Sequence, residues 1–241
     1  SYNEIAKELC HHPLVETDGA VFLVPSKKYD FKWLFYNKDG SEAEMCGNAA
    51  RCVTVFAHQE KIVKGHCEFE TQAGTIKGEV ISAKIARVQM TPIKMEMFNQ
   101  IIKDDSVYTK YDYIDSGVPH CVIKADSLQQ LQDLRPLATQ LRKPQYFAPR
   151  GANITFKVPL GKAHIESISF ERGVEDFTEA CGTGAVAAAY SHRHEHPEQN
   201  IIRVSVPGGE LKVEFIEGFP FLSGAVNFMG EIQIAELRGE E

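Results

Sequence analysis

Two cysteines in the sequence each precede a glycine and a small polar residue, in the segments Cys46-Gly47-Asn48 and Cys181-Gly182-Thr183. Apolar residues at helical spacing follow the first segment, and an alanine-rich run of high helix propensity follows the second. Each cysteine is therefore predicted to stand at the N-terminus of a helix. Unpaired backbone N–H groups and the helix dipole favour a thiolate there, which gives either sulfur the character of a base or a nucleophile.

Two sites of this kind indicate proton transfer on both faces of one carbon atom. If the two parts of the chain enclose a cleft, one sulfur as thiolate removes a proton from a carbon next to a carboxylate, and the other as thiol returns a proton to the opposite face. The adjacent glycines let the carboxylate approach the N–H groups of both helices, which would stabilise a carbanion-like transition state. We therefore predict Cys46 and Cys181 as acid/base residues of a reaction that inverts a stereocentre and needs neither a cofactor nor a metal.

An internal repeat relates the two cysteine segments. Cys181 lies 135 residues after Cys46, and the same offset aligns segment 73–80 with segment 208–215, with matches at glycine, lysine and glutamate positions. The pattern predicts two related halves. We bound them at residues 1–108 and 109–230, because a polar run at 103–106 interrupts the apolar pattern. A last strand is expected near 231–238, with the first half as a candidate partner.

Local patterns predict the elements that position the first cysteine. Ile5 and Leu9 have helical spacing, so a short helix is expected up to Cys10. The runs 20–24 and 31–36 are typical of strands, and Asp39-Gly40 is a strong turn signal. The expected order is therefore helix, two strands, a turn and then the cysteine-led helix.

The composition limits the possible partners and compartments. The 241 residues are 43% apolar and 24% charged, and the net charge of −7 disfavours nucleic acid or an anionic membrane as a partner. No apolar stretch approaches the roughly 18 to 20 residues that a membrane helix needs. No secretory pattern opens the sequence, and six cysteines are too few for a disulfide framework. We predict a cytoplasmic protein that binds a small molecule.

Several segments resemble those of the diaminopimelate epimerase family. The matches occur in family order between about Ile5 and Gly230, and the two cysteine motifs are highly specific. The matching segments are Asn37-Lys38-Asp39-Gly40-Ser41, Met45-Cys46-Gly47-Asn48-Ala49-Ala50-Arg51-Cys52, Gly117-Val118-Pro119-His120, Ala152-Asn153-Ile154-Thr155-Phe156, Glu171-Arg172-Gly173, Ala180-Cys181-Gly182-Thr183-Gly184 and Pro207-Gly208-Gly209.

The resemblance implies an α/β (α+β) fold of two pseudo-symmetric domains, each a β-barrel-like sheet around a central helix. It also implies interconversion of LL- and meso-diaminopimelate, on the route to lysine and peptidoglycan, by an enzyme that is usually a homodimer and uses no pyridoxal phosphate. Cys46 and Cys181 match the catalytic pair, and His120 matches a histidine near it. Arg172 is suited to a bidentate grip on the distal carboxylate. The positions that match substrate-binding residues are Asn37, Gly47, Asn48, Asn153, Glu171, Arg172, Gly182 and Thr183.

The sequence departs from the family pattern near the expected pocket. Members usually open with a strand whose Gly-Asn-Asp-Phe-like segment touches the substrate, and the sequence from Ser1 lacks it, so either the sequence is truncated or the pocket is incomplete. Segment 10–19 lacks the usual Gly-Ile-Gly-Ala before Asp-Gly. Val118 stands where many members have an asparagine, and Ala49 where glycine is common. These departures bear on the choice of substrate more than on the reaction.

Other functions remain open on the sequence alone. One is a catalytically silent protein that binds diaminopimelate, and another is a racemase on the same fold that acts on proline or histidine. Glu171-Arg172 argues against the racemase, because a short substrate has no distal carboxylate. A thiol redox role would require a reversible disulfide, which would block the site.

The remaining residues with possible chemistry have plainer interpretations. Cys10, Cys52, Cys67 and Cys121 are predicted to be core residues. The run His192–His196 could form a metal site, but a solvated basic helix end before Pro197 is the better interpretation. A phosphate loop at 182–184 is disfavoured, because the lysine of such loops is missing.

Overall fold

The structure is a computed structural model that describes residues 1–15, 17–129 and 131–233. It divides into two compact units, one formed by Ser1–Ala86 with the described residues from Val226 on, and one by Arg87–Ala225. The boundary expected between residues 108 and 109 falls at the start of the second strand of an antiparallel pair within the second unit. The strand expected near 231–238 falls mostly outside the described residues, and residues 231–233 are in no strand.

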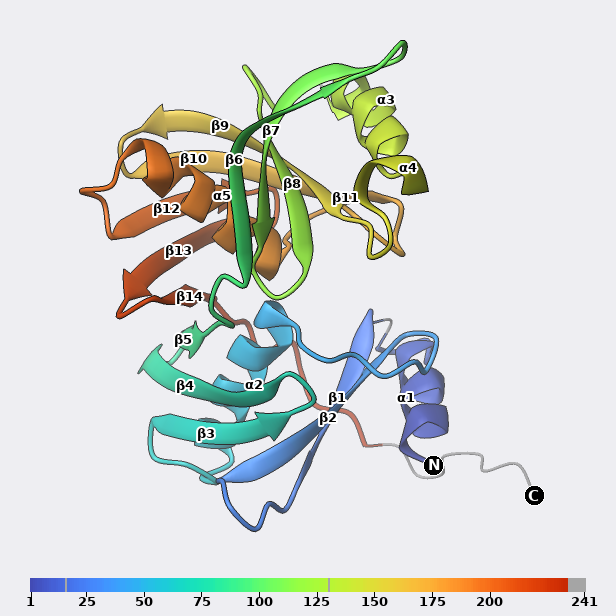
Figure 1. Ribbon diagram of the computed structural model, residues 1–241. Helices are drawn as coiled ribbons and strands as arrows, with labels where there is room; N and C mark the ends of the chain where they lie inside the picture. Colours follow the sequence, from blue (N-terminus) through green and yellow to red (C-terminus); the bar gives the residue numbers. More distant parts are fainter. Residues whose placement is uncertain (16, 130, 234–241) are drawn as a thin grey trace. The chain divides into compact units, whose positions relative to one another are not determined.

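The first unit joins a mixed sheet to two helices (Figure 1). Its strands lie in the order β1-β2-β3-β4, with a parallel β2–β3 pair between two antiparallel pairs. Helix α1 packs on β1 and β2, and α2 packs on β3 and β4. The elements are α1 (Tyr2–Cys10), β1 (Gly19–Val24), β2 (Phe31–Asn37), α2 (Gly47–Gln59), β3 (His66–Thr71) and β4 (Gly74–Ser82), followed by β5 (Ile85–Gln89), which ends in the second unit. The expected order of helix, strands, turn and cysteine-led helix is confirmed.

Aromatic packing forms the core of the first unit. Phe31 and Trp33 are buried on either side of the exposed Lys32 along β2, so both point to one face of the sheet. The ring of Phe69 on the parallel neighbour β3 stacks on Phe31 at 4.9 Å and lies 5.5 Å from Trp33. All three residues are at most 3% exposed, so this cluster fixes the pairing of β2 with β3.

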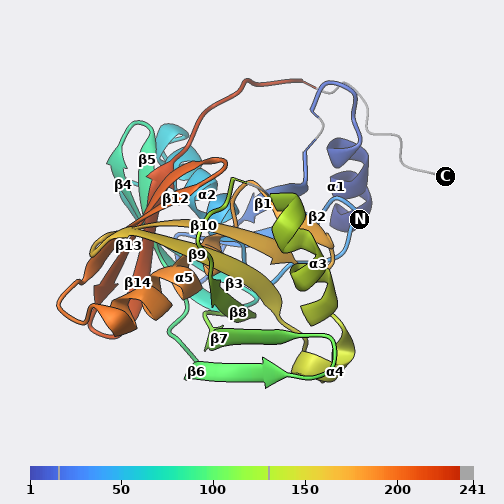
Figure 2. The same ribbon diagram turned by 90° about the horizontal axis from the view of Figure 1, so that it is seen from above.

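The second unit is a larger sheet wrapped around one helix (Figures 1 and 2). Its strands lie in the order β14-β13-β12-β10-β9-β8-β7-β6, and β11 pairs with β10. The elements are β6 (Met95–Lys103), β7 (Tyr108–Asp115), β8 (Pro119–Lys124), α3 (Leu131–Leu141), α4 (Pro144–Phe147), β9 (Asn153–Gly161), β10 (His164–Glu171), β11 (Asp176–Thr178), α5 (Gly182–Glu195), β12 (Ile201–Val206), β13 (Gly209–Ile216) and β14 (Phe219–Ala225).

Helix α5 is the central helix of this unit. It contacts strands β7–β10 and β12–β14, and its alanines at 185 and 187–189 are at most 1% exposed. Alanine suits this position because it favours the helix and its small side chain lets strands approach from every side. The predicted α/β fold with a sheet around a central helix is confirmed here.

Strands β9 and β10 have one apolar and one polar face. On β9, Ile154 and Phe156 join an apolar cluster with α3, whereas the alternate residues Asn153, Thr155 and Lys157 are polar and buried. Serines 167 and 169 alternate in the same way on β10. Because successive strand residues point to opposite faces, these polar residues form a row on the α5 side.

The predicted repeat is visible in the strand pairing of the two units. Strand β3 spans residues 66–71, and β12 spans 201–206, the same positions 135 residues later. Within the hairpins, His66 pairs with Glu79 and Ile201 with Glu214, so both partners shift by 135. The two units are therefore related in topology and in register, as the pseudo-symmetric fold requires.

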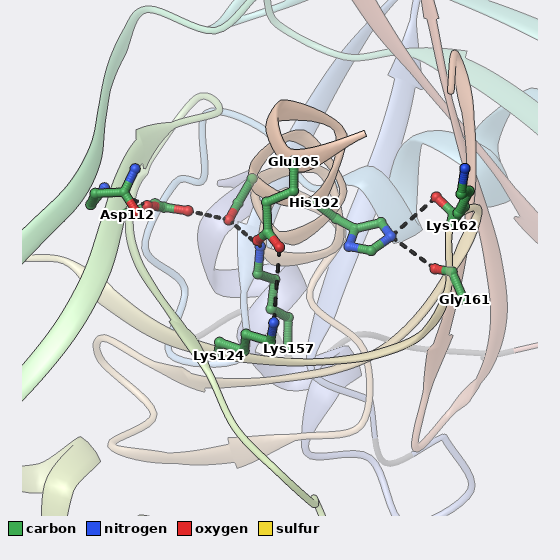
Figure 3. A network of polar contacts seen from close by, with 9 residues as sticks. Asp112, Lys124, Lys157, Gly161, Lys162, His192 and Glu195 are labelled. Atoms are coloured by element: carbon green, nitrogen blue, oxygen red, sulfur yellow. Dashed lines mark hydrogen bonds and ion pairs between the residues drawn. The ribbon is translucent and has the colours of Figure 1, made fainter. Parts of the chain in front are cut away.

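A polar network fixes the C-terminal end of α5 (Figure 3). The ammonium group of Lys157, 2% exposed, donates at 2.7 Å to both Ser191 Oγ and Glu195 Oε1. Ser191 in turn donates to Asp112 of β7. A buried charge of this kind needs a full set of partners, so the network sets the position of α5 along its axis.

Candidate functional site

Cys46 is the N-cap residue of α2, as predicted. Its backbone is extended, with φ −142° and ψ 120°, and its carbonyl oxygen accepts the first intrahelical hydrogen bond from Ala50 at 2.9 Å. Gly47 is buried, and Cys46 and Asn48 are partly exposed. The N–H groups of the first helical turn have no acceptor within the helix, so this end of α2 is suited to hold an anion.

Arg51 belongs to the same helix turn and was not predicted to be a site residue. Its Nη2 donates to Asn48 Oδ1 at 3.0 Å, and its side chain is buried, with the residue 6% exposed. Burial lowers its pKa, and negative charge on the nearby Cys52 and Cys46 sulfurs acts in the opposite direction. Arg51 thus places a buried positive charge next to Cys46 and orients the amide of Asn48. We call Cys46, Gly47, Asn48 and Arg51 the Cys46 cluster.

Asn37 ends strand β2 and takes part in the predicted turn. Its Nδ2 donates to Ser41 Oγ at 3.0 Å, and its backbone carbonyl accepts from Gly40 at 2.9 Å. Gly40 adopts φ +82°, a conformation that strongly favours glycine. The structure thus gives Asn37 a clear role in the turn, and its proposed contact with the substrate stays a prediction.

Cys181 is the N-cap residue of α5 and is 9% exposed. Its carbonyl oxygen accepts from Ala185 at 2.9 Å, and its Sγ lies 3.5 Å from Thr183 Oγ1. A Cβ added to Gly184 would lie 2.2 Å from Ser169 Oγ, so the helix start is tight against β10. Glycine at this position lets the first turn of α5 approach the sheet.

The environment of Cys181 favours the thiol. Burial raises the pKa of Cys181 to about 12, the negative charge of Glu171 adds to this effect, and hydrogen bonds from Thr183 and Gly184 oppose it. The expectation that the helix N-terminus would favour a thiolate is therefore wrong for Cys181 in the structure described. Desolvation of the charged sulfur outweighs the helix N–H groups.

His120 lies beside Cys181 and is completely buried. Its Nε2 is 3.0 Å from Thr183 Oγ1 and 3.4 Å from Asn153 Nδ2, and its Nδ1 is 2.8 Å from Thr155 Oγ1. Burial lowers the pKa of His120 to about 3, so the ring is neutral near pH 7. It is a hydrogen-bonding partner of the site, rather than a charged acid.

Glu171 and Arg172 follow each other at the end of β10. The Glu171 carboxylate accepts from the Thr178 hydroxyl, and the backbone N–H of Arg172 donates to Asn153 Oδ1 at 2.8 Å. Arg172 is exposed, and its guanidinium donates to the carbonyl oxygen of Arg150. The structure thus brings together the predicted residues Cys181, Thr183, Asn153, Glu171 and Arg172 with His120, as the Cys181 cluster.

Sequence reasoning missed the hydroxyl groups that support this cluster. Thr155 Oγ1 lies 2.9 Å from Ser169 Oγ, its cross-strand partner, behind His120. Alternating polar residues along an otherwise apolar strand are a signal that could have found Thr155. Ser169 and Thr178 gave no comparable signal before the pairing of the strands was known.

Two other expectations need correction. Cys52 is exposed and not a core residue, whereas Cys10, Cys67 and Cys121 are buried as predicted. His192 is buried rather than solvated, since its Nε2 meets the carbonyl oxygens of Gly161 and Lys162 at 3.0 and 3.1 Å (Figure 3).

Over the described part of the chain, no cluster of three or more His, Cys, Asp or Glu side chains is arranged to hold a metal ion. No helix within residues 1–15, 17–129 and 131–233 is long and apolar enough to cross a membrane.

Solved structures of low sequence identity share this fold. A probable proline racemase from Agrobacterium radiobacter K84 superposes with a TM-score of 0.70 at 17% identity, covering 97% of this chain and 81% of that one. A putative phenazine biosynthesis PhzC/PhzF protein from Clostridium difficile strain 630 also gives 0.70, at 19% identity and coverages of 96% and 87%. At these identities the likeness establishes the fold alone.

Sequence relatives are more specific. The diaminopimelate epimerase family model matches residues 1–96 and 113–229. The chain is 36% identical over 231 residues to the diaminopimelate epimerase of Hydrogenobaculum sp. strain Y04AAS1, covering 93% of this chain and 83% of the relative. It is 35% identical over 245 residues to that of Aquifex aeolicus strain VF5, with coverages of 98% and 87%. With both cysteine-capped helices in place, this chain belongs to the diaminopimelate epimerase family.

Proposed function

We propose that this chain is a diaminopimelate epimerase that interconverts the LL and meso isomers without a cofactor. The observation that carries the proposal is the pair of helices capped by Cys46 and Cys181 in a chain whose relatives bear that name. In this proposal the substrate's reacting carboxylate binds to the first-turn N–H groups of α2 and α5, contributed by Gly47, Asn48, Gly182 and Thr183. The same family supports a place in lysine and peptidoglycan precursor synthesis, a cytoplasmic location and a homodimer.

The proposed reaction moves one proton off the α-carbon and another onto it. A thiolate takes the α-proton as the C–H bond breaks, and the electron pair stays on the α-carbon, delocalised into the bound carboxylate. The second cysteine, as thiol, then gives its proton to the opposite face. The buried, neutral Cys181 is suited to be the proton donor of the resting state, with Cys46, which interacts electrostatically with the positive Arg51, as the base. After one turnover the two roles are exchanged.

The remaining predicted residues would select the substrate. Asn37, Asn153 and Glu171 are proposed to bind the polar groups of diaminopimelate, and Arg172 its distal carboxylate, because a planar guanidinium matches a carboxylate with two hydrogen bonds. Proline and histidine have no distal carboxylate, so a racemase that acts on them would not need Glu171 and Arg172. Equal turnover of proline and diaminopimelate would therefore contradict the assignment.

The direct experiment follows the α-hydrogen. LL-diaminopimelate is incubated with the enzyme in D2O. The isomers are separated by chiral chromatography, and the deuterium content of each is measured by mass spectrometry. We expect meso product with deuterium at the inverted carbon, loss of epimerisation in Cys46→Ala and Cys181→Ala, and normal turnover in Cys52→Ala, which removes an exposed cysteine of the same helix. Full activity in either catalytic variant would refute the two-base scheme, and tight binding without exchange would indicate a silent binding protein.

A further inference from the structure

The hydrogen bonds around His120 fix the position of its proton. The backbone N–H of Arg172 can only donate, so the side-chain atom of Asn153 that it meets at 2.8 Å is the oxygen. The other end of that amide is then the nitrogen, 3.4 Å from His120 Nε2. An amide nitrogen also only donates, so Nε2 is an acceptor and the proton of the neutral ring is on Nδ1.

The opposite side of the ring agrees with this assignment. His120 Nδ1 lies 2.8 Å from Thr155 Oγ1, which lies 2.9 Å from Ser169 Oγ. A protonated Nδ1 donates to Thr155, whose own hydroxyl can then donate to Ser169. All three side chains are buried on the α5 face of the sheet, and each finds a hydrogen-bonding partner within this chain of contacts.

Thr183 connects this network to the sulfur. Its hydroxyl oxygen is 3.0 Å from His120 Nε2 and 3.5 Å from Cys181 Sγ. The hydroxyl has one proton, so it can donate to only one of these two atoms at a time. A thiol at Cys181 can donate to Thr183, which frees the hydroxyl proton for Nε2. A thiolate can only accept, so the same proton would turn to the sulfur.

We propose that His120 is held as the neutral Nδ1–H tautomer by Asn153, Thr155 and Ser169, and that the Thr183 hydroxyl turns from His120 to the sulfur whenever Cys181 becomes a thiolate. When the hydroxyl turns away, the Asn153 amide still donates to Nε2, so His120 never loses its acceptor contact. Thr155 and Ser169 are thus positioning residues, and His120 takes no proton. The alternation of thiol and thiolate rests on the proposed epimerase function, whereas the tautomer does not.

His192 provides an internal reference. Its Nε2 faces two backbone carbonyl oxygens, at 3.0 and 3.1 Å, and carbonyl oxygens only accept. Two acceptors require a donor at Nε2, so the proton of the neutral ring is on Nε2, and burial, which lowers the pKa of His192, favours that neutral ring. The two buried histidines are therefore expected to be opposite tautomers in one protein.

Nitrogen NMR tests the tautomers without substrate. The protein is labelled with 15N-histidine, long-range proton–nitrogen spectra are recorded at pH 7, and the rings are assigned with His120→Gln and His192→Gln. We expect a protonated Nδ1 in His120 and a protonated Nε2 in His192. A protonated Nε2 or an imidazolium at His120 would overturn the proposal, whatever the activity of the enzyme.

Two pairs of variants test the supporting hydroxyls. Thr155→Val removes the acceptor of Nδ1–H and should shift His120 towards the other tautomer, whereas Thr155→Ser should not. Thr183→Val should leave the tautomer unchanged but slow alkylation of Cys181 by iodoacetamide roughly 10-fold or more at fixed pH, the scale of one hydrogen bond to a charged group. Thr183→Ser keeps the hydroxyl and should retain the wild-type rate of alkylation. An unchanged alkylation rate in Thr183→Val would contradict the turning hydroxyl.

Failure of the proposed function is distinguishable from failure of this inference. If the wild-type protein does not epimerise diaminopimelate but shows the two opposite tautomers, the function is wrong and the tautomer assignment stands. If the wild-type protein epimerises diaminopimelate but has His120 in the Nε2–H form, the function stands and the tautomer assignment is wrong.

Discussion

Gly184 lies directly against Ser169, since a Cβ atom at position 184 would be 2.2 Å from Ser169 Oγ. The same Cβ would be 3.2 Å from the Cys181 Cβ atom, so both neighbours would have to shift to admit it. This contact links the helix that carries the sulfur to the strand that carries Ser169.

Gly184→Ala is expected to destabilise the protein by about 1–3 kcal/mol, the usual cost of overpacking a tight contact, and to reduce activity. Urea unfolding at pH 7 measures the change. Gly161→Ala is the matched control, because a Cβ there meets no atom within 4 Å. The double variant Ser169→Gly/Gly184→Ala should recover part of the stability, and a simple sum of the two single effects would contradict the steric explanation.

Glu171→Gln should make Cys181 more reactive. The carboxylate of Glu171 is the largest charged contribution that raises the pKa of this thiol, after burial itself. Removing the charge lowers the pKa and increases the thiolate fraction, so alkylation of Cys181 at fixed pH should be faster in the absence of substrate. Glu175→Gln, which removes a nearby carboxylate that pairs with Arg142, is the control and should leave the rate unchanged.

Arg51→Met should make Cys46 less reactive towards iodoacetamide, because the buried positive charge favours an anionic sulfur nearby. Arg51→Lys keeps the charge and should retain most of the rate, which separates the effect of charge from that of packing. Peptide mass spectrometry distinguishes Cys46 from Cys52. Removing the exposed charge of Lys77 in the same unit, as Lys77→Gln, serves as the control, and an equal loss there would argue for a general effect of net charge.

The Lys157–Glu195 pair should respond asymmetrically to substitution. Glu195→Gln leaves the Lys157 ammonium buried without its counter-charge, whereas Lys157→Met removes the buried charge and leaves Glu195, whose side chain is 40% exposed. We expect the glutamate variant to lose more free energy of unfolding, by about 1–3 kcal/mol.

The Lys157–Glu195 pair also predicts a loss of folding stability at low pH. Burial alone would raise the pKa of Glu195. The hydrogen bond and the charge of Lys157 together outweigh this effect, so the net shift of the pKa is downward from 4.5. The pair's contribution is then complete above pH 4.5 and decreases as the carboxylate is protonated below it. Urea unfolding between pH 3 and pH 7 measures this, with Lys124→Met as the exposed-lysine control.

Buried thiols predict a loss of stability in alkali. Burial raises the pKa of Cys121 well above 9.0 and that of Cys67 to about 11, so the unfolded chain releases these protons first. Each such thiol should reduce the free energy of unfolding by about 1.4 kcal/mol per pH unit above pH 9. Cys121→Ala should show a shallower slope between pH 8 and pH 10.5 than the wild-type protein. Parallel slopes would contradict this assignment.

The sequence predicted the elements that local chemistry determines. Cys46 and Cys181 were placed at helix starts because glycine and small polar residues precede helical patterns, and both are N-caps. The 135-residue offset predicted the repeat, which the register of β3–β4 and β12–β13 confirms. These features depend on residues that are close in sequence or that recur at a fixed interval.

The features that the sequence did not predict depend on distant residues. His120 and Thr155 meet only because β8 and β9 are parallel neighbours, and Thr155 meets Ser169 through the β9–β10 register. The raised pKa of Cys181 depends on burial by strands, which no local pattern reports. Likewise, the exposure of Cys52 and the burial of His192 follow from how each helix packs on its sheet.

Helix α5 separates two tasks along its length. Its 14 residues place Glu195 roughly 20 Å from Cys181, at 1.5 Å per residue. The lysine-centred network holds the far end, whereas the reactive sulfur is at the other. Substitutions in the lysine-centred network can therefore change the stability of α5 without contacting the residues of the Cys181 cluster, and they would reach Cys181 only through a shift of the helix along its axis.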